Sequence, residues 1–188
     1  MRKAWRNNER VLALKKAVQC AKLLRDTSVM EFYPSAWVLV TEILDTFGDL
    51  VFQRIRDRSN DTAREAAEAA AKAAAASEKG GAEERENFGN KKAKFPLPDD
   101  FTGTDVTTEA RETCRNWFFK TAQIRELVPR VYVEIALARC YRFICEGEGE
   151  EVEQELAQVF DRLASSMRGI ADPLVAIHAR AYLGGFAG

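Results

Sequence analysis

Apolar residues recur at helical spacing in the first third of the chain. Over residues 3–25 they follow one another at steps of three and four, and a second stripe runs from Pro34 to about Arg58. This spacing gathers apolar side chains on one face of an α-helix. Pro34 suits the first turn of the second helix, where an N–H would have no helical partner. The pattern therefore predicts two amphipathic helices before residue 59.

The same periodicity returns after residue 107. It predicts four further helices, over residues 108–128, 129–144, 152–169 and 172–184. Pro129 disfavours helical backbone at the residue before it, so we expect the first of these helices to end at Val128. Asp172 followed by Pro173 is typical of a helix start, and Gly184 with Gly185 marks the expected stop. No stretch alternates with period two, so the expected fold class is all-α.

The segment between these halves has a different composition. Residues 63–76 contain ten alanines in fourteen positions, which favours helix but offers little bulk for a core. Residues 77–107 are rich in Gly, Pro and charge. We therefore expect residues 59–107 to be one long mobile insertion, and deletion of residues 61–105 to cost little stability.

Composition sets broad limits on the class of protein. The chain has 188 residues, of which 46% are hydrophobic and 30% charged, enough for one domain with a real core. Twenty-eight Lys and Arg against 29 Asp and Glu give a net charge of −1, so overall charge does not favour a nucleic-acid partner. The four cysteines fall within apolar helical patterns and are expected to be reduced core residues. The N-terminus does not resemble an export signal, and no apolar run is long enough to span a membrane.

Residues for catalysis or metal binding are scarce. His178 is the only histidine, and its apolar neighbour Ile177 favours a packed or surface imidazole over a general base. Cys140 and Cys145 have no nearby His or Cys pair that would complete a zinc site, and there is no phosphate-binding glycine motif. We therefore expect no enzyme activity, no cofactor and no metal. A helical enzyme that uses Cys114 or Cys140 is the remote alternative.

Two features remain as candidates for recognition. One is the basic face of the first helix, which predicts a rival function: binding of anionic lipid or nucleic acid. Its residues are Arg2, Lys3, Arg6, Arg10, Lys15, Lys16, Lys22 and Arg25. The other is the helix junction around Pro129. There Arg130 either caps the carbonyls at the end of the preceding helix or stands out as an interface anchor.

Several long motifs resemble one known family in the same order. The strings are Trp117–Lys120, Ile124–Glu134, Ala17–Leu24, Asp26–Val29, Phe32–Ser35, Ile43–Gly48, Met167–Ile170, Asp172–Val175 and Ala179–Leu183. They resemble the large scaffold subunit of the retriever complex, a paralogue of the large α-solenoid subunit of retromer. The resemblance covers most of residues 4–58 and 110–183.

The resemblance implies a HEAT-like α-solenoid fragment of stacked antiparallel helix pairs that does no chemistry. It implies a first helix pair in 1–58, an expanded family loop in 59–107 and further solenoid helices in 108–188. In the family, the N-terminal solenoid holds an arrestin-fold subunit and the C-terminal part holds a phosphoesterase-fold subunit. Coiled-coil and COMM-domain proteins join that assembly, which recycles membrane cargo from endosomes. The implied location is cytoplasmic and peripheral on endosomes, with only indirect membrane contact.

Two comparisons with the family refine these expectations. The retromer paralogue carries a Pro-Arg-Leu-Tyr-Leu motif tied to docking of its arrestin-fold partner, and this chain has Pro129, Arg130 and Tyr132 in that order. The implied partner-binding residues are Arg125, Pro129, Arg130, Tyr132 and Glu134. Because the family's scaffold continues far beyond 188 residues, we expect this chain to be a fragment without the phosphoesterase-fold docking surface.

Overall fold

The computed structural model describes residues 1–77, 95–145 and 150–187. Its α-helices are α1 (Arg2–Arg6), α2 (Arg10–Lys22), α3 (Tyr33–Ser77), α4 (Thr108–Ala122), α5 (Leu127–Ala136), α6 (Glu150–Ser166) and α7 (Pro173–Ala187). Short 3-10 turns lie at Leu23–Arg25, Met30–Phe32, Gly103–Asp105, Ala138–Phe143 and Met167–Gly169. Within the described ranges the chain forms helices and turns and no strand, so the predicted all-α class is confirmed.

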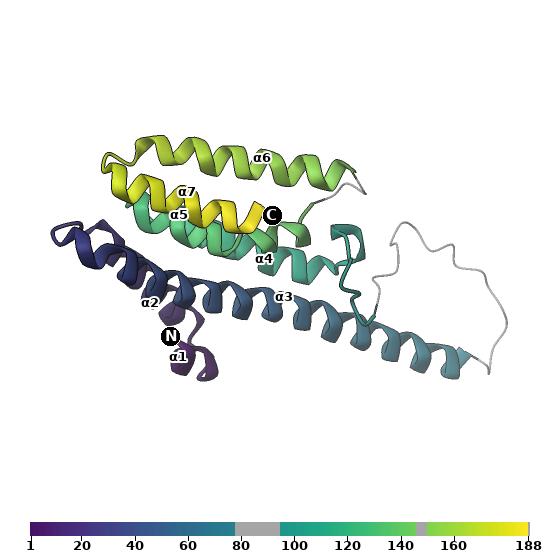
Figure 1. Cartoon of the computed structure of the whole chain (residues 1–188). Coiled ribbons are helices and arrows are strands. Elements are labelled where there is room, and N and C mark those ends of the chain that lie inside the picture. Colours follow the sequence, from purple (N-terminus) through teal and green to yellow (C-terminus); the bar gives the residue numbers. More distant parts are fainter. Residues whose placement is uncertain (78–94, 146–149, 188) are drawn as a thin grey trace.

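The helices are stacked in layers around α5 (Figure 1). Helix α3 runs along one side of the molecule, and its C-terminal part projects past the other helices. Helix α6 lies on the opposite side, and α7 runs back antiparallel to it. Layered antiparallel helices are the arrangement expected of an α-solenoid fragment.

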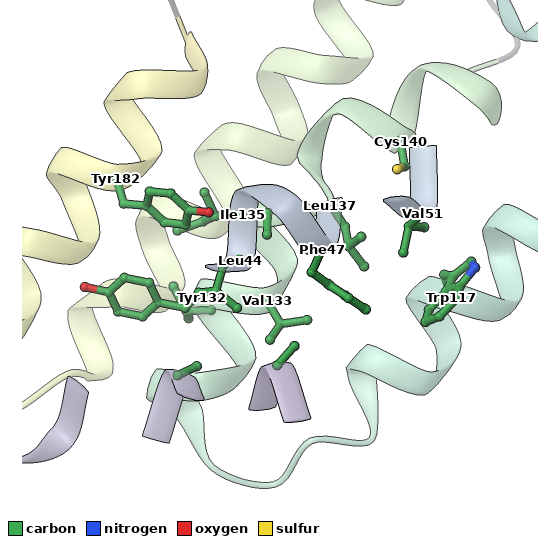
Figure 2. Close-up of a cluster of buried hydrophobic side chains, with 14 of the residues drawn as sticks. Leu44, Phe47, Val51, Trp117, Tyr132, Val133, Ile135, Leu137, Cys140 and Tyr182 are labelled. Carbon is green, nitrogen blue, oxygen red and sulfur yellow. The ribbon is translucent and has the colours of Figure 1, made fainter. Parts of the chain in front are cut away.

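The core forms where α2, α3, α4 and α7 enclose α5. Every residue of α5 from Val131 to Ala136 is buried. Ala13, Ala17 and Ala21 give α2 a smooth buried face, which lets that helix pack closely. Leu44, Phe47 and Val51 of α3 supply larger side chains to the same core (Figure 2). The apolar stripes predicted for these segments therefore point inward, as helical periodicity requires.

A glycine sets how closely α3 approaches the end of α5. A Cβ atom on Gly48 would lie 2.1 Å from the carbonyl oxygen of Ala136. No side chain fits at that distance, so the crossing of α3 over α5 depends on glycine at this position.

The first predicted helix is interrupted, which corrects the expectation of one helix over residues 3–25. Asn8 adopts a left-handed backbone conformation with φ of 63°, which asparagine tolerates better than most residues. The break lets α1 pack Trp5 against the core. Its ring stacks on Trp117 at a centroid distance of 5.9 Å and meets the edge of Phe47 at 6.3 Å.

The predicted mobile insertion differs from the structure at its start. Helix α3 continues to Ser77, far beyond the expected end near Arg58. Within residues 33–73 of this helix Ala63 is the last buried residue, and residues 64–73 are exposed. An established helix extends without a new nucleation cost, and alanine has the highest helix propensity.

The insertion also differs at its end, where residues 95–107 pack against the core. Leu97 and Phe101 are fully buried, and the Phe101 ring lies 4.7 Å from that of Phe143. Arg56 of α3 donates to the carbonyl oxygen of Leu97 at 2.9 Å, and Asn60 accepts from its N–H at 2.8 Å. This finding corrects the expectation of a mobile segment at 95–107; residues 78–94 lie outside the described ranges.

Other helix boundaries also differ from prediction. Helix α4 ends at Ala122, and α5 begins at Leu127, so Pro129 lies inside the first turn of α5. That position is compatible with proline because the first N–H groups of a helix have no intrahelical acceptor. Helix α5 ends at Ala136 and is followed by a 3-10 segment, and α7 passes through both glycines to Ala187. The predicted start of α7 is confirmed, since Asp172 accepts from the N–H of Leu174 at 2.8 Å.

Phe101→Ala tests whether the 95–107 segment belongs to the core. Loss of a fully buried phenylalanine should lower the free energy of unfolding by about 3–5 kcal/mol, measured by urea denaturation. Phe95→Ala is the control, because this ring is half exposed and should cost much less. Equal, small effects of both substitutions would contradict the packing. Deletion of residues 61–105, which removes Leu97 and Phe101, should likewise be destabilising.

Candidate partner-binding site

The α4–α5 junction carries the residues expected to bind a partner. Arg125 is exposed in the connection between the two helices, and Glu126 is the N-cap residue of α5. The carboxylate of Glu126 forms ion pairs with Lys22 and Arg25, at the end of α2 and in the turn that follows it. These pairs join the start of α5 to the neighbouring helix. The hydrogen bond from Lys22, with help from Arg25, lowers the pKa of Glu126.

Pro129 and Tyr132 lie inside the protein. Tyr132 has no exposed surface, and its ring stacks on Tyr182 of α7 at a centroid distance of 5.6 Å. Burial raises the pKa of the Tyr132 hydroxyl. In this conformation the two residues pack α5 against its neighbours and are out of reach of another protein.

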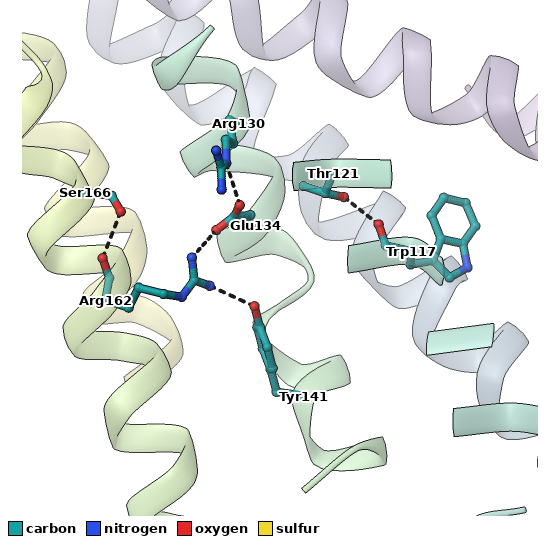
Figure 3. Close-up of polar contacts among 7 residues, drawn as sticks. All are labelled: Trp117, Thr121, Arg130, Glu134, Tyr141, Arg162 and Ser166. Atoms are coloured by element: carbon teal, nitrogen blue, oxygen red, sulfur yellow. Dashed lines mark hydrogen bonds and ion pairs between the residues drawn. The ribbon is translucent and has the colours of Figure 1, made fainter. Parts of the chain in front are cut away.

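Glu134 forms the polar contact between α5 and α6 (Figure 3). Its side chain is 7% exposed and lies between two guanidinium groups: Arg130 Nε at 2.8 Å from Oε1 and Arg162 Nη1 at 2.9 Å from Oε2. Arg162 also donates to the Tyr141 hydroxyl at 2.8 Å. A buried carboxylate is tolerated only when its charge is matched, and here two cations match it.

The structure thus separates the five predicted residues into three sets, the first of which is the buried pair of Pro129 and Tyr132. Arg130 and Glu134 lie one helical turn apart and bind each other, while Arg125 stands outside the protein. Arg130 is 40% exposed on its side chain. Its bond to Glu134 differs from the carbonyl cap considered from the sequence, and it leaves part of the guanidinium accessible.

Sequence reasoning missed the partners that hold this site in place. Arg162 is 28 residues from Glu134 and 21 residues from Tyr141 along the chain. No local sequence pattern indicates pairings over such separations. Lys22 and Arg25 are assigned to a basic face, although both form ion pairs with Glu126. The four-residue spacing of Arg130 and Glu134 is the one signal that could have been used.

The basic face of the first two helices is not continuous. Lys22 and Arg25 bind Glu126, and the Arg10 guanidinium lies 4.2 Å from the centroid of the Trp5 ring. Lys22 and Arg25 stay exposed despite these ion pairs, and Arg2, Lys3, Arg6, Lys15 and Lys16 are exposed as well.

The cysteines and the histidine are packed residues. Cys114, Cys140 and Cys145 are free and buried, and burial raises the pKa of the Cys140 thiol to about 12. Such a thiol stays protonated near neutral pH and is a poor nucleophile. His178 lies against the rings of Tyr33 and Trp37, at centroid distances of 4.9 and 5.3 Å.

Neither a metal-binding cluster nor a membrane-spanning helix is present among the described residues. No group of three or more His, Cys, Asp or Glu side chains in these ranges is placed to hold a metal ion. None of the helices described combines the length and the apolar content needed to cross a membrane.

Glu126→Gln tests the ion pairs at the start of α5 through their pH dependence. Because the pKa of Glu126 is lowered in the folded chain, its contribution is complete above the unfolded value of about 4.3 and is lost as the pH falls through the lower folded value. The variant should melt at a lower temperature than the parent at pH 7, and the difference should vanish in acid. Glu65→Gln, an exposed glutamate away from both ends of α3, is the control and should melt close to the parent at pH 7.

Glu134→Gln tests the contact between α5 and α6. The change leaves two guanidinium groups without their carboxylate and should lower the free energy of unfolding by about 1–3 kcal/mol. Combining it with Arg162→Met in a double-mutant cycle should give a smaller loss than the sum of the two single changes. Additive losses would show that the two side chains do not stabilise each other.

Comparison with known proteins gives consistent matches over nearly the whole chain. A family model described as VPS35L matches residues 1–187. The chain is 44% identical over 183 residues to a protein of Danio rerio and 42% identical over 181 residues to one of Dictyostelium discoideum. Both are named VPS35 endosomal protein-sorting factor-like, as is a Drosophila melanogaster protein with 41% identity over 181 residues.

These matches cover nearly all of the chain but a small part of each relative. They include 97% of this chain and 15% of the zebrafish protein, and 96% and 14% for the Dictyostelium protein. The resemblance to the retriever scaffold subunit, drawn from the sequence motifs, is therefore confirmed. With a family match over residues 1–187 and relatives above 40% identity, the chain belongs to the VPS35L family.

Proposed function

We propose that this chain is a non-enzymatic scaffold segment of a retriever-like endosomal sorting complex, and that its α4–α5 junction docks an arrestin-fold subunit. The relatives named as endosomal protein-sorting factors support the general role. The motif Pro129-Arg130-Val131-Tyr132, which is similar to the docking motif of the retromer paralogue, supports the specific partner.

The geometry of Arg130 is the observation that carries this proposal. Its Nε atom is fixed by Glu134, and its side chain remains 40% exposed. A guanidinium held from one side loses little conformational entropy when a partner binds the other side. Arginine is also among the residues that contribute most to protein interfaces. Pro129 and Tyr132 act indirectly in this proposal, because they pack the helix that presents Arg130.

Other members of the assembly are further from this segment. A phosphoesterase-fold subunit would bind the C-terminal helices of the family scaffold, which the aligned 15% of the relatives does not include. Coiled-coil and COMM-domain proteins remain expected companions of the whole complex. Action at endosomes would follow from membership of that complex, with membrane contact made by other subunits.

The alternative function, binding of anionic lipid or nucleic acid by the basic face, has less support. Three of its eight cations are engaged within the chain, by Glu126 or by Trp5. Binding driven by phosphate contacts weakens steeply as salt rises, so a salt titration separates this function from the proposed one.

Arg130→Met tests the proposed docking site. The purified chain should bind the arrestin-fold subunit of the same organism, and the substitution should weaken binding at least about tenfold in isothermal titration calorimetry. The fold should survive the change, because Arg162 still neutralises Glu134. Arg180→Met, an exposed arginine of α7, is the matched control and should leave the affinity unchanged.

Two results would contradict the proposal. One is unchanged affinity of a folded Arg130→Met variant, which would place the interface elsewhere. The other is a large fall in melting temperature with the loss of binding, which would show that Arg130 acts by holding the fold together.

A further inference from the structure

A second surface feature, a cavity of about 400 Å³, lies where α3, the end of α5 and α7 meet. One wall is a single face of α3 that carries Trp37, Asp45 and Asp49 at helical spacing. The opposite wall is α7, which contributes Tyr182 and Phe186. The cavity therefore combines aromatic rings from two helices with carboxylates from one.

The acidic groups of the cavity are only partly neutralised. The Tyr182 hydroxyl donates to Asp45 Oδ1 at 2.6 Å, and Arg139 donates to Asp49 Oδ1 at 3.0 Å. Among the residues that the structure describes, no cation pairs with Asp45. Asp45 and Asp49 against Arg139 leave the lining with one negative charge in excess. Both carboxylates are on exposed residues, so a ligand can reach them from solvent.

At the rim of the cavity one guanidinium, that of Arg139, already lies between a carboxylate and an aromatic ring. Arg139 pairs with Asp49, and its guanidinium lies 5.1 Å from the centroid of the Phe52 ring. A cation gains from a carboxylate and from the face of an aromatic ring at the same time. Asp45, Trp37 and Phe186 all line the cavity, so a carboxylate and aromatic rings are available to a cation there as well.

We propose that this cavity binds a basic side chain, an arginine or a lysine, from a partner protein. The excess negative charge selects a cation, and the aromatic walls accommodate its apolar stem as well as its charged end. The volume is within the range of about 300–1,000 Å³ that is usual for ligand pockets and accepts one extended side chain with its backbone. The site uses different residues from the Arg130 surface, so it would bind a different part of a partner or a different protein.

Two adjacent glycines provide a matched pair of variants. A Cβ atom added to Gly184 or to Gly185 would meet nothing within 4 Å, so either position accepts a side chain without a clash at that atom. Only Gly185 lines the cavity. Gly185→Leu should therefore fill the cavity. Gly184→Leu makes the same glycine-to-leucine change in α7 and should leave the cavity open.

The test is an NMR titration of the 188-residue chain with blocked amino acids. N-acetyl-arginine methylamide should shift the indole N–H resonance of Trp37 in a saturable way. N-acetyl-citrulline methylamide, which is neutral and nearly the same shape, should bind at least about tenfold more weakly. Gly185→Leu and Asp45→Asn should abolish or strongly reduce the response to arginine, and Gly184→Leu should preserve it. Circular dichroism melting confirms that each variant is folded.

Several outcomes would overturn the proposal. Equal affinity for arginine and citrulline, or an equal response to N-acetyl-leucine methylamide, would show a cavity that selects shape or apolar surface. Loss of the response in Gly184→Leu as well as Gly185→Leu would show an effect on α7 as a whole. Concentration-dependent dimerisation that disappears in Gly185→Leu would identify the occupant as a second copy of the chain, and absence of any shift would exclude a basic ligand.

Discussion

The fold depends on burying α5 on almost every side. This helix is predominantly apolar from Leu127 to Ala136, and neighbouring helices remove its surface from water. Such burial is the main favourable contribution to folding, but it carries Glu134 into the interior as well. Arg130 from the same helix and Arg162 from α6 offset the cost of burying this carboxylate, because each binds one of its oxygens. The polar contact therefore fixes where α6 lies relative to α5, while the apolar contacts hold the two close.

Sequence reasoning recovered the helices whose apolar spacing is regular, and it erred where other forces decide. The start of α7 follows from local chemistry, because Asp172 caps the helix and Pro173 fits its first turn. The length of α3 does not follow from apolar spacing, because alanine extends a helix that the core has already started. The packing of Leu97, Phe101 and Val106 was missed because local composition does not reveal it. Their segment is rich in Gly, Pro and charge, and tertiary contacts alone place these three apolar residues in the core.

The candidate site was predicted in part, and its division has a physical cause. Five residues close together in sequence were grouped as one surface, but a helix turns by about 100° per residue and sends neighbours in different directions. Tyr132 therefore faces α7 and Arg130 faces outward. The partners Lys22, Arg25 and Arg162 come from distant helices, and a single sequence contains no sign of which acidic residue each will meet. Burial and ion pairing, rather than motif membership, decide which residues of the motif another protein can reach.

The C-terminal part of α3 extends beyond the packed helices. Between Ala63, the last buried residue in 33–73, and Ser77, the helix advances about 20 Å at 1.5 Å per residue. The end of α3 at Ser77 is thus held well away from the packed helices, although residues 95–107 return to the core. A fluorescent label placed near the end of α3 would report by energy transfer how closely a bound protein approaches the packed helices.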